Sequence, residues 1–334
     1  MNNQRQSNFE LLRIVAMLGV MTLHACSAVD SYGLMFFFSV VSVNVFILIS
    51  GWFKIKLRLK GFLNFMFLVG FWTCINALWV VCESSTIGVG ELLLRMNPLK
   101  NWFIASYLML MLMSPILNGF VDSGGVYREG FLCVWFGVEM LLDLVLPMKL
   151  WGIFSGGYSV FHFIGIYLLG AYLHEHSAGW VIKRFSRCVW FLTYVGISLG
   201  STLMYMLLNS MSLRDGIVGQ FATAVAHRLG LYSSPLVILA SVALFMVFAG
   251  IRIQSSFINH VATSMFAVFL AHCPSYYRQT IQSIGREHVG LSESVNIVGF
   301  VCCIFVGAVV LDQFRIALWK SLCSLIAKVN HKSI

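Results

Sequence analysis

Charged residues are scarce in this chain: they make up 10% of its 334 residues, whereas soluble domains carry about 25%. This shortage excludes an ordinary water-soluble globular fold, because such a fold keeps charged side chains on its surface. Prolines are also rare, at 5, which favours long helices. The alternation of apolar and polar residues that is typical of transmembrane barrels is missing. The chain is therefore predicted to be an all-α polytopic membrane protein that contacts membrane lipid.

Motifs for metal, redox and nucleic-acid chemistry are absent as well. The 9 cysteines form no C-x-x-C pair and lie in or beside apolar segments, where cysteine behaves as a small apolar side chain. No metal site and no tightly bound cofactor are expected. The formal net charge is +9, but the basic residues punctuate the apolar segments instead of forming one patch. Membrane orientation explains them better than a nucleic-acid partner does.

Ten apolar segments approach the length of about 20 residues that a helix needs to cross a bilayer. Glu10 and Arg13 interrupt the first apolar run, so this segment is predicted to be a retained helix and not a cleaved signal peptide. No soluble domain or linker is evident, and residues 1–334 are predicted to form a single membrane-embedded domain. The predicted spans are 9–29, 34–53, 61–82, 102–121, 131–148, 158–174, 188–208, 232–250, 257–274 and 294–318.

Lysine and arginine residues mark one side of the predicted membrane. The loops on the opposite side carry fewer charges, of mixed sign. The positive-inside rule makes the basic side cytoplasmic, and an even number of spans then puts both termini there. The residues on the basic side are Arg5, Lys54, Lys56, Arg58, Lys60, Arg128, Lys183, Arg184, Arg187, Arg252, Lys320, Lys328 and Lys332.

Arg13 and His24 are the most informative pair of residues, because both lie on the first predicted span. Eleven positions bring a helix back to nearly the same face, and they separate the two residues by about 16 Å along the axis. Exposure of either group to lipid is costly, so a protein interior or a wet cavity is expected around them. The alternative is that Arg13 is a flanking residue that snorkels and pairs with Glu10 at i,i+3.

Histidines of three spans are expected at a similar depth. With the predicted orientation, His24, His162 and His272 all lie towards the outer face, and His227 with Arg228 lies in an outer loop at nearby height. Such a set can line an active site. The alternative for His162 and His272 is that they are interfacial histidines that hydrogen-bond headgroups or backbone.

Ser50-Gly51 ends the second span just before Lys54, Lys56 and Arg58. A small polar pair at this position can form a notch that admits an anionic cofactor beside the cations. It can equally let two helices approach closely or end the helix. The basic residues can likewise serve only to set the membrane topology.

Arg13 and His24, with ten residues between them, resemble the signature of the integral-membrane acyltransferases often called the acyltransferase 3 family. Four further segments resemble that family in the expected order, and the likeness covers nearly the whole chain. They are a serine-glycine-aromatic end to the second helix at 46–53, a tryptophan-led helix at 101–115, an LLG-x-YL segment at 167–173 and a late helix ending in histidine at 263–272.

The resemblance implies transfer of an acyl group, usually acetyl, to hydroxyls of bacterial surface or secreted polysaccharides or of their lipid-linked precursors. It also implies a multi-pass protein of the bacterial cytoplasmic (inner) membrane, with acetyl-CoA as co-substrate. Two features depart from the family. The arginine-x-x-arginine motif near the third helix of some members is absent, and no extracytoplasmic hydrolase-like domain is appended.

This hypothesis assigns roles to nine residues. His24 is the general base or transient acyl carrier, and His272 is a second catalytic candidate. Arg13 serves the reaction by binding the anionic donor. The expected donor-binding residues are Arg13, Ser50, Lys54 and Arg58, and the expected sugar-binding residues are Trp102, Tyr107 and His162.

Two other functions stay open. A transporter or proton-coupled permease would also use intramembrane Arg and His, but it usually needs buried acidic residues, of which Glu139 and Asp143 are the main candidates. A non-catalytic assembly scaffold is the third possibility. The acceptor, the hydroxyl that is modified, the acyl chain and the oligomeric state stay open as well.

Overall fold

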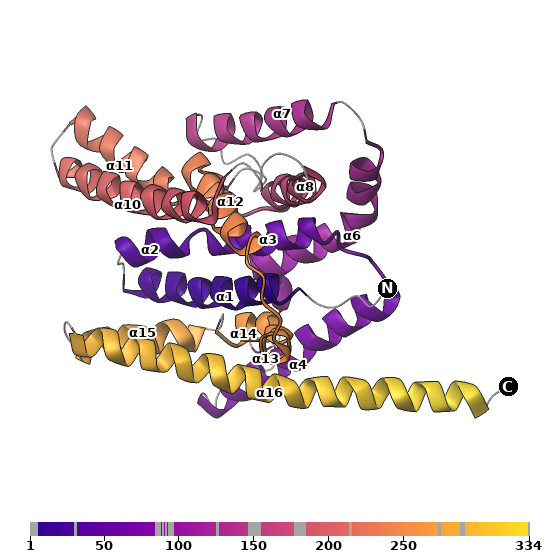
Figure 1. Ribbon diagram of the computed structural model, residues 1–334. Helices are drawn as coiled ribbons and strands as arrows, with labels where there is room; N and C mark the ends of the chain where they lie inside the picture. The colour runs from indigo at the N-terminus through magenta and orange to yellow at the C-terminus, as the bar shows by residue number, and fades with distance from the viewer. Residues whose placement is uncertain are drawn as a thin grey trace. The chain divides into compact units, whose positions relative to one another are not determined.

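The computed structural model describes residues 6–29, 32–83, 88, 90, 92, 97–124, 127–145, 155–176, 185–213, 216–272, 275–287 and 291–332. Within these ranges every regular element is helical (Figure 1). The predicted all-α class is therefore confirmed for the described chain. Arg5, Lys183 and Arg184, which entered the sequence argument, lie outside these ranges.

Within the described ranges, six helices are long and apolar enough to cross a membrane, and they support a membrane protein. These candidate spans are Ser7–Ala28, Leu34–Trp52, Leu59–Cys82, Trp102–Asp122, Arg187–Ser212 and Ser292–Lys328. The segments Ser256–His272 and Tyr276–Glu287 are long and apolar enough only when taken together, and they are bent by 72° relative to each other. Pro235–Ala249 is a shorter apolar helix. The fifth and sixth predicted spans overlap the helices Arg128–Met140 and Val160–His176. These helices have 13 and 17 residues, fewer than the about 20 that a membrane span needs.

The chain divides into two compact units. The first comprises Met1–Leu57 and Asn101–Ile258, and the second comprises Arg58–Lys100 and Asn259–Ile334. The helices of the first unit are α1 (Ser7–Ala28), α2 (Leu34–Ser39), α3 (Ser42–Trp52), α6 (Trp102–Asp122), α7 (Arg128–Met140), the π-helical turn η2 (Leu141–Val145), α8 (Val160–His176), α10 (Arg187–Ser212), α11 (Ile217–Leu229) and α12 (Pro235–Ala249). α13 (Ser256–Ala262) crosses the boundary between the units.

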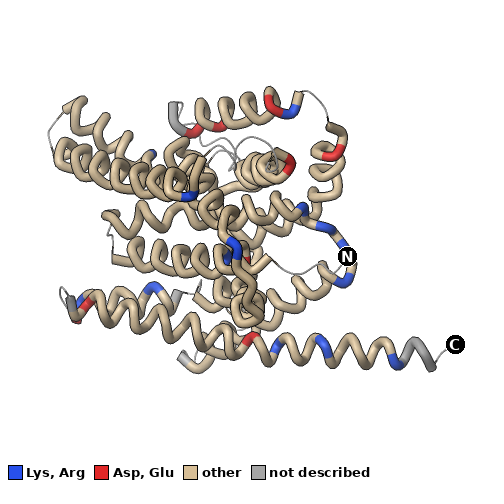
Figure 2. Tube along the Cα trace, viewed as in Figure 1, with Lys and Arg blue, Asp and Glu red and all other residues tan. Residues whose placement is uncertain are grey.

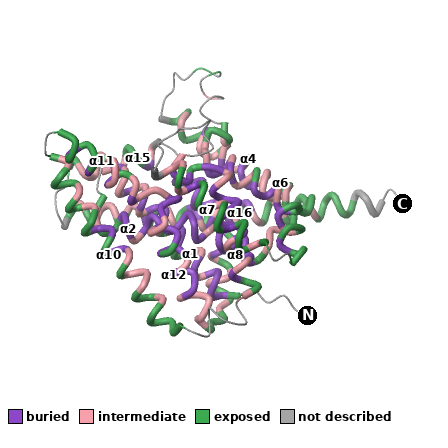
Figure 3. Tube along the Cα trace, turned by 90° about the horizontal axis from the view of Figure 1, so that it is seen from above, coloured by how far each residue is buried: buried purple, intermediate pink, exposed green. Residues whose placement is uncertain are grey.

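Helix α3 forms the centre of the first unit. It contacts α1, α8 and α12, while α8 also contacts α6 and α7, and α10 contacts α2, α11 and α12 (Figure 1). Buried residues accordingly concentrate on α3 and α8. Helices α10 and α11 are mostly half-buried or exposed (Figure 3). The sequence of α3 is apolar on all sides, as expected for a helix surrounded by others.

Two glycines explain the close contact of α3 with α8. A Cβ atom added to Gly51 would lie 2.0 Å from the backbone oxygen of Tyr167, and one added to Gly170 would lie 2.3 Å from that of Leu48. Only glycine leaves room for two backbones at this distance. The Ser50-Gly51 and LLG-x-YL segments therefore meet each other, and their glycines have a packing role.

The second unit contains α4 (Leu59–Glu83), the short 3₁₀ turn η1 (Pro98–Lys100), α14 (Met265–His272), α15 (Ser275–Glu287) and α16 (Leu291–Lys332). α16 contacts α4, α14 and α15. Its Asp312 and Arg315 are 0% and 3% exposed and pair with each other at 2.5 Å between Oδ1 and Nε. Asn64 and Trp72 of α4 also contact this pair, at 3.4 Å and 3.5 Å. A polar cluster thus joins α4 to α16.

Charged residues lie mainly at or near helix ends, and the helix interiors are largely free of them (Figure 2). In the first unit Lys54, Asp122, Arg128 and Glu175 come together just after α3, at the ends of α6 and α8 and at the start of α7. This cluster defines one end of the first unit, called here the Lys54 end.

Candidate functional site

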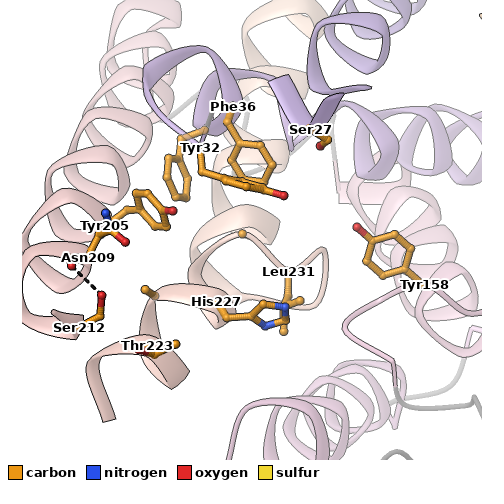
Figure 4. Close-up of a pocket in the computed structure, with 13 residues that line it drawn as sticks. Ser27, Tyr32, Phe36, Tyr158, Tyr205, Asn209, Ser212, Thr223, His227 and Leu231 are labelled. Carbon is orange, nitrogen blue, oxygen red and sulfur yellow. Dashed lines mark hydrogen bonds between the residues drawn. The ribbon is translucent and has the colours of Figure 1, made fainter. Parts of the chain in front are cut away.

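A cavity of about 370 Å³ lies in the first unit, within the range of about 300–1,000 Å³ that small-molecule sites occupy. In Figure 4, Tyr32, Phe36 and Tyr205 line one side, Tyr158 faces them from the other, and His227 lies between. The lining joins the end of α1, the segment around α2, the turn before α8, the last turns of α10, and α11 with the turn that follows it. The residues are Ser27, Tyr32, Phe36, Phe37, Tyr158, Tyr205, Asn209, Ser212, Thr223, Ala226, His227, Gly230 and Leu231.

Helix α1 connects this cavity with the other end of the unit. It is unbroken over Ser7–Ala28, and it carries both Arg13 and His24, which are half-buried. On the stripe between them, Met17 and Val20 are each only 3% exposed. Ser27, one turn beyond His24, lines the cavity. His24 does not line the cavity itself, but its position on α1 is about one helical turn from Ser27, which does.

Arg13 lies towards the opposite end of α1, where the ring of Phe9 packs 5.3 Å from Trp52 and 5.2 Å from Phe53. Its Nη1 donates to both carboxylate oxygens of Glu10, at 2.9 Å and 3.0 Å, which is the i,i+3 pair considered from the sequence. The Arg13 side chain is 32% exposed. Among the described residues Nε and Nη2 make no hydrogen bond, so these donors can still bind an anion.

Lys54 and Ser50 have partners within the first unit. Lys54 has a positive φ of 51°, and its Nζ contacts Asp122 at 2.5 Å and Glu175 at 3.4 Å. The hydroxyl of Ser50 donates to the carbonyl of Phe46 at 3.0 Å, in the preceding turn of its own helix. A donor molecule at Lys54 would therefore compete with two carboxylates. Arg58, the other expected cation, is exposed and belongs to the second unit.

Trp102 and Tyr107 lie on α6. Asn101 caps this helix by accepting from the backbone N–H groups of Phe103 and Ile104. The ring of Trp102 lies 4.7 Å from Tyr158 and 5.8 Å from Tyr232, so it packs behind the cavity wall without lining the cavity. Tyr107 stacks on Phe103 at 6.0 Å.

His162 is fully buried, at 0% exposure. Its Nδ1 lies 2.9 Å from Oε1 of Glu139, and its Nε2 lies 2.9 Å from Oδ1 of Asn44. The amide nitrogen of Asn44 donates to the carbonyl of Tyr232 at 3.0 Å. The predicted sugar-binding histidine thus has both ring nitrogens occupied by protein groups, and it can act on the cavity only through its neighbours.

His272 belongs to α14 of the second unit and is 1% exposed. Its Nδ1 lies 2.7 Å from the carbonyl of Val268, and its ring packs against Phe269 and Tyr277 at centroid distances of 5.7 Å and 5.3 Å. Within its unit it is a core histidine. A catalytic role for it stays a prediction.

Several residues of this site did not stand out in the sequence. Asn44 lies inside an apolar run, where a lone polar residue is itself a signal that can be read from the sequence. The aromatic lining formed by Tyr32, Tyr158 and Tyr205 gave no such signal, because aromatic residues are common throughout the chain, at 14%.

Comparison of the chain with protein-family models, with curated proteins and with solved structures finds no match. The resemblance to the acyltransferase 3 family therefore stays a prediction from the ordered sequence motifs.

Proposed function

We propose that this protein is a membrane-bound O-acyltransferase that moves an acyl group, most simply acetyl, from a cytoplasmic donor such as acetyl-CoA to a hydroxyl of an extracytoplasmic glycan or its lipid-linked precursor. The proposal includes ten membrane spans in the bacterial cytoplasmic membrane, with both termini in the cytoplasm. The Lys54 end of the first unit would then face the cytoplasm and the cavity the outside, in agreement with the positive-inside rule.

One observation carries the proposal: on the same helix as Arg13, His24 is one turn from Ser27, which lines a cavity with hydroxyl, amide and imidazole groups in its wall. An imidazole beside an acceptor cavity can serve as a general base. A guanidinium about 16 Å away along the axis can bind the phosphates of the donor. The two groups together suit a site that is entered from two sides of the membrane.

The cavity lining favours a neutral acceptor rich in hydroxyls. Among the described residues, its polar groups are hydroxyls of Ser, Thr and Tyr, the Asn209 amide and the His227 imidazole, with no Lys, Arg, Asp or Glu. Aromatic faces such as Tyr32 and Tyr205 can pack on the apolar face of a sugar ring, while the hydroxyls and amide bond its OH groups. An acidic or cationic sugar would lack a charged partner there.

The chemistry balances with His24 as the base. Its neutral ring nitrogen takes the proton of the acceptor hydroxyl while the oxygen attacks the thioester carbonyl. The C–S bond then breaks, and the leaving thiolate takes the proton back from the imidazolium. An acyl-His24 intermediate is the alternative route with the same overall balance. Arg13, with Lys54 of the same unit as a further candidate, would hold the donor phosphates.

Ester-linked acyl groups on surface glycan provide the test. The gene would be deleted in its host and restored as wild type, His24→Ala or His260→Ala, with the protein level in the membrane checked by immunoblot. His260 is an exposed histidine of α13 and serves as the matched control. We expect one NMR acyl signal to be lost on deletion, to return with wild type and His260→Ala, and to be at least about 100-fold weaker with His24→Ala. Full activity of His24→Ala would refute the assignment.

A proton-coupled permease is the second candidate, and a specific observation favours it. Glu139 with His162 and Asp312 with Arg315 are buried ionisable pairs on helices, the kind of group that proton-coupled carriers use. Solute uptake into proteoliposomes without any acyl donor, abolished by Glu139→Gln or Asp312→Asn, would favour this function over acyl transfer.

A further inference from the structure

Glu139 and His162 form a deeply buried hydrogen-bonded pair in the first unit, with the two side chains 1% and 0% exposed. Asn44, also 0% exposed, contacts the other side of the imidazole. The amide nitrogen of Asn44 donates to the Tyr232 carbonyl, so its oxygen must face His162 and accept from Nε2–H. A second hydrogen bond joins Nδ1 to Oε1 of Glu139. The two bonds together fix the imidazole ring from both sides.

The network ends on the wall of the cavity. Asn44 donates to the carbonyl of Tyr232. The ring of Tyr232 packs against that of Tyr158, with the ring centroids 4.7 Å apart. Trp102 packs against both rings, at 5.8 Å and 4.7 Å. Tyr158 in turn lines the cavity opposite Tyr32 and Tyr205 (Figure 4). Three hydrogen-bonding side chains from α3, α7 and α8 therefore support one aromatic wall.

The turn that carries Tyr158 is held by the same elements. Gly156 and Gly157 have φ values of +69° and +87°, which side-chain-bearing residues rarely adopt. The carbonyl of Gly156 accepts from the Tyr232 N–H at 3.0 Å, and its N–H donates to Oδ1 of Asp143 at 3.1 Å. Asp143 lies one turn after Glu139, in the π-helical turn η2, so the α7–η2 segment anchors both His162 and the Tyr158 turn.

We propose that Glu139, His162 and Asn44 are positioning residues that hold the Tyr158–Tyr232–Trp102 wall in the conformation that binds the acceptor. They do not touch the acceptor themselves, since none of the three lines the cavity. This inference takes only one thing from the proposed function, namely that the ligand of the cavity is the acyl acceptor. The coupling of the network to the wall can be measured without any substrate.

The wall can be followed by fluorine NMR of the detergent-solubilised protein labelled with 5-fluorotryptophan. The chain has 9 tryptophans, and Trp102→Phe identifies the resonance of Trp102. Asn44→Leu and Glu139→Leu remove hydrogen bonds of the network, whereas Glu139→Gln keeps an acceptor for His162 at nearly the same volume. Asn118→Leu is the matched control. Asn118, at the Lys54 end, also donates to a backbone carbonyl, that of Ile55 at 2.8 Å, and accepts from Tyr167 at 2.6 Å.

We expect Asn44→Leu and Glu139→Leu to shift or split the Trp102 resonance, and Glu139→Gln and Asn118→Leu to leave it in place, even where Asn118→Leu lowers the melting temperature. In the acyl-transfer assay, the acceptor KM should rise at least about tenfold in the two leucine variants of the network with kcat little changed, because a displaced wall would lose contacts with the acceptor worth about one hydrogen bond.

An unmoved Trp102 resonance in both Asn44→Leu and Glu139→Leu would overturn the proposal, as would an equal shift in Asn118→Leu. If the wild-type protein transfers no acyl group, the proposed function fails, but the fluorine spectra still decide whether the network holds the wall. A fall in kcat with unchanged acceptor KM would assign the network to the chemical step and refute a positioning role.

Discussion

The chain contains two Arg–carboxylate pairs with the same i,i+3 spacing but different burial, and their comparison gives a sharp stability prediction. Asp312 and Arg315 on α16 are 0% and 3% exposed. The Arg13 side chain of the pair with Glu10 on α1 is 32% exposed. Both pairs are in hydrogen-bond contact, with an Nε–Oδ1 distance of 2.5 Å between Arg315 and Asp312 and an Nη1–Oε1 distance of 2.9 Å between Arg13 and Glu10.

Removal of the acid should therefore have unequal effects. Asp312→Ala leaves the Arg315 guanidinium buried beside Asn64 and Trp72 without its counter-charge, which costs about 3–5 kcal/mol. Glu10→Ala leaves Arg13 able to reach water or headgroups, so its cost should stay below about 1 kcal/mol. With a shift of about 2–4 °C in Tm per kcal/mol for a chain of this order of size, Asp312→Ala should lower Tm by about 6–20 °C and Glu10→Ala by less than about 4 °C.

Thermal unfolding in detergent, followed by tryptophan fluorescence, measures both shifts. Trp72 lies beside Asp312 and reports on the second unit. Asp312→Asn keeps an acceptor for Arg315 without the charge and should fall between wild type and Asp312→Ala. Equal shifts for Asp312→Ala and Glu10→Ala would refute the reasoning, because burial would then not decide the strength of the pair.

Two further outcomes follow from packing and from surface charge. Gly51→Ala and Gly170→Ala should each destabilise the protein by about 1–3 kcal/mol, because the added methyl would meet a backbone oxygen that cannot move away. Gly70→Ala on α4 is the control: its Cβ would meet nothing within 4 Å, and it should stabilise by up to about 1 kcal/mol, as measured by denaturant unfolding. Lys54→Ala should cost less than about 1 kcal/mol at low salt and close to nothing in about 1 M salt, where charges at the protein surface are screened. A salt-independent loss of several kcal/mol would show that the Lys54 ion pairs behave as buried ones.

Much of the secondary structure could be predicted from apolar run length. The predicted span 9–29 corresponds to Ser7–Ala28, 61–82 to Leu59–Glu83 and 102–121 to Trp102–Asp122, within two residues at each end. Such agreement is expected because in a bilayer each apolar run must satisfy its own backbone groups, which a helix does locally.

The length of apolar runs did not predict helix breaks caused by polar side chains, and it did not predict amphipathic helices. The predicted span 257–274 is broken at Thr263, whose hydroxyl bonds the carbonyl of His260 at 2.6 Å. A side chain that competes for a backbone carbonyl in this way interrupts the helical ladder. α11 (Ile217–Leu229) was not predicted as a helix at all, because only one of its faces is apolar and no long apolar run marks it.

Part of the candidate site could also be predicted from the sequence, and part of it depends on tertiary contacts. That Arg13 and His24 share a face follows from helical periodicity alone, so spacing was sufficient to single them out. The partners of His162 were not accessible in this way, since Glu139 and Asn44 lie 23 and 118 residues away in the chain. The cavity likewise draws its lining from five separate stretches. Helices are determined by neighbours four residues apart, whereas a cavity depends on which helix faces pack together, and that is set by long-range contacts such as those of Gly51 and Gly170.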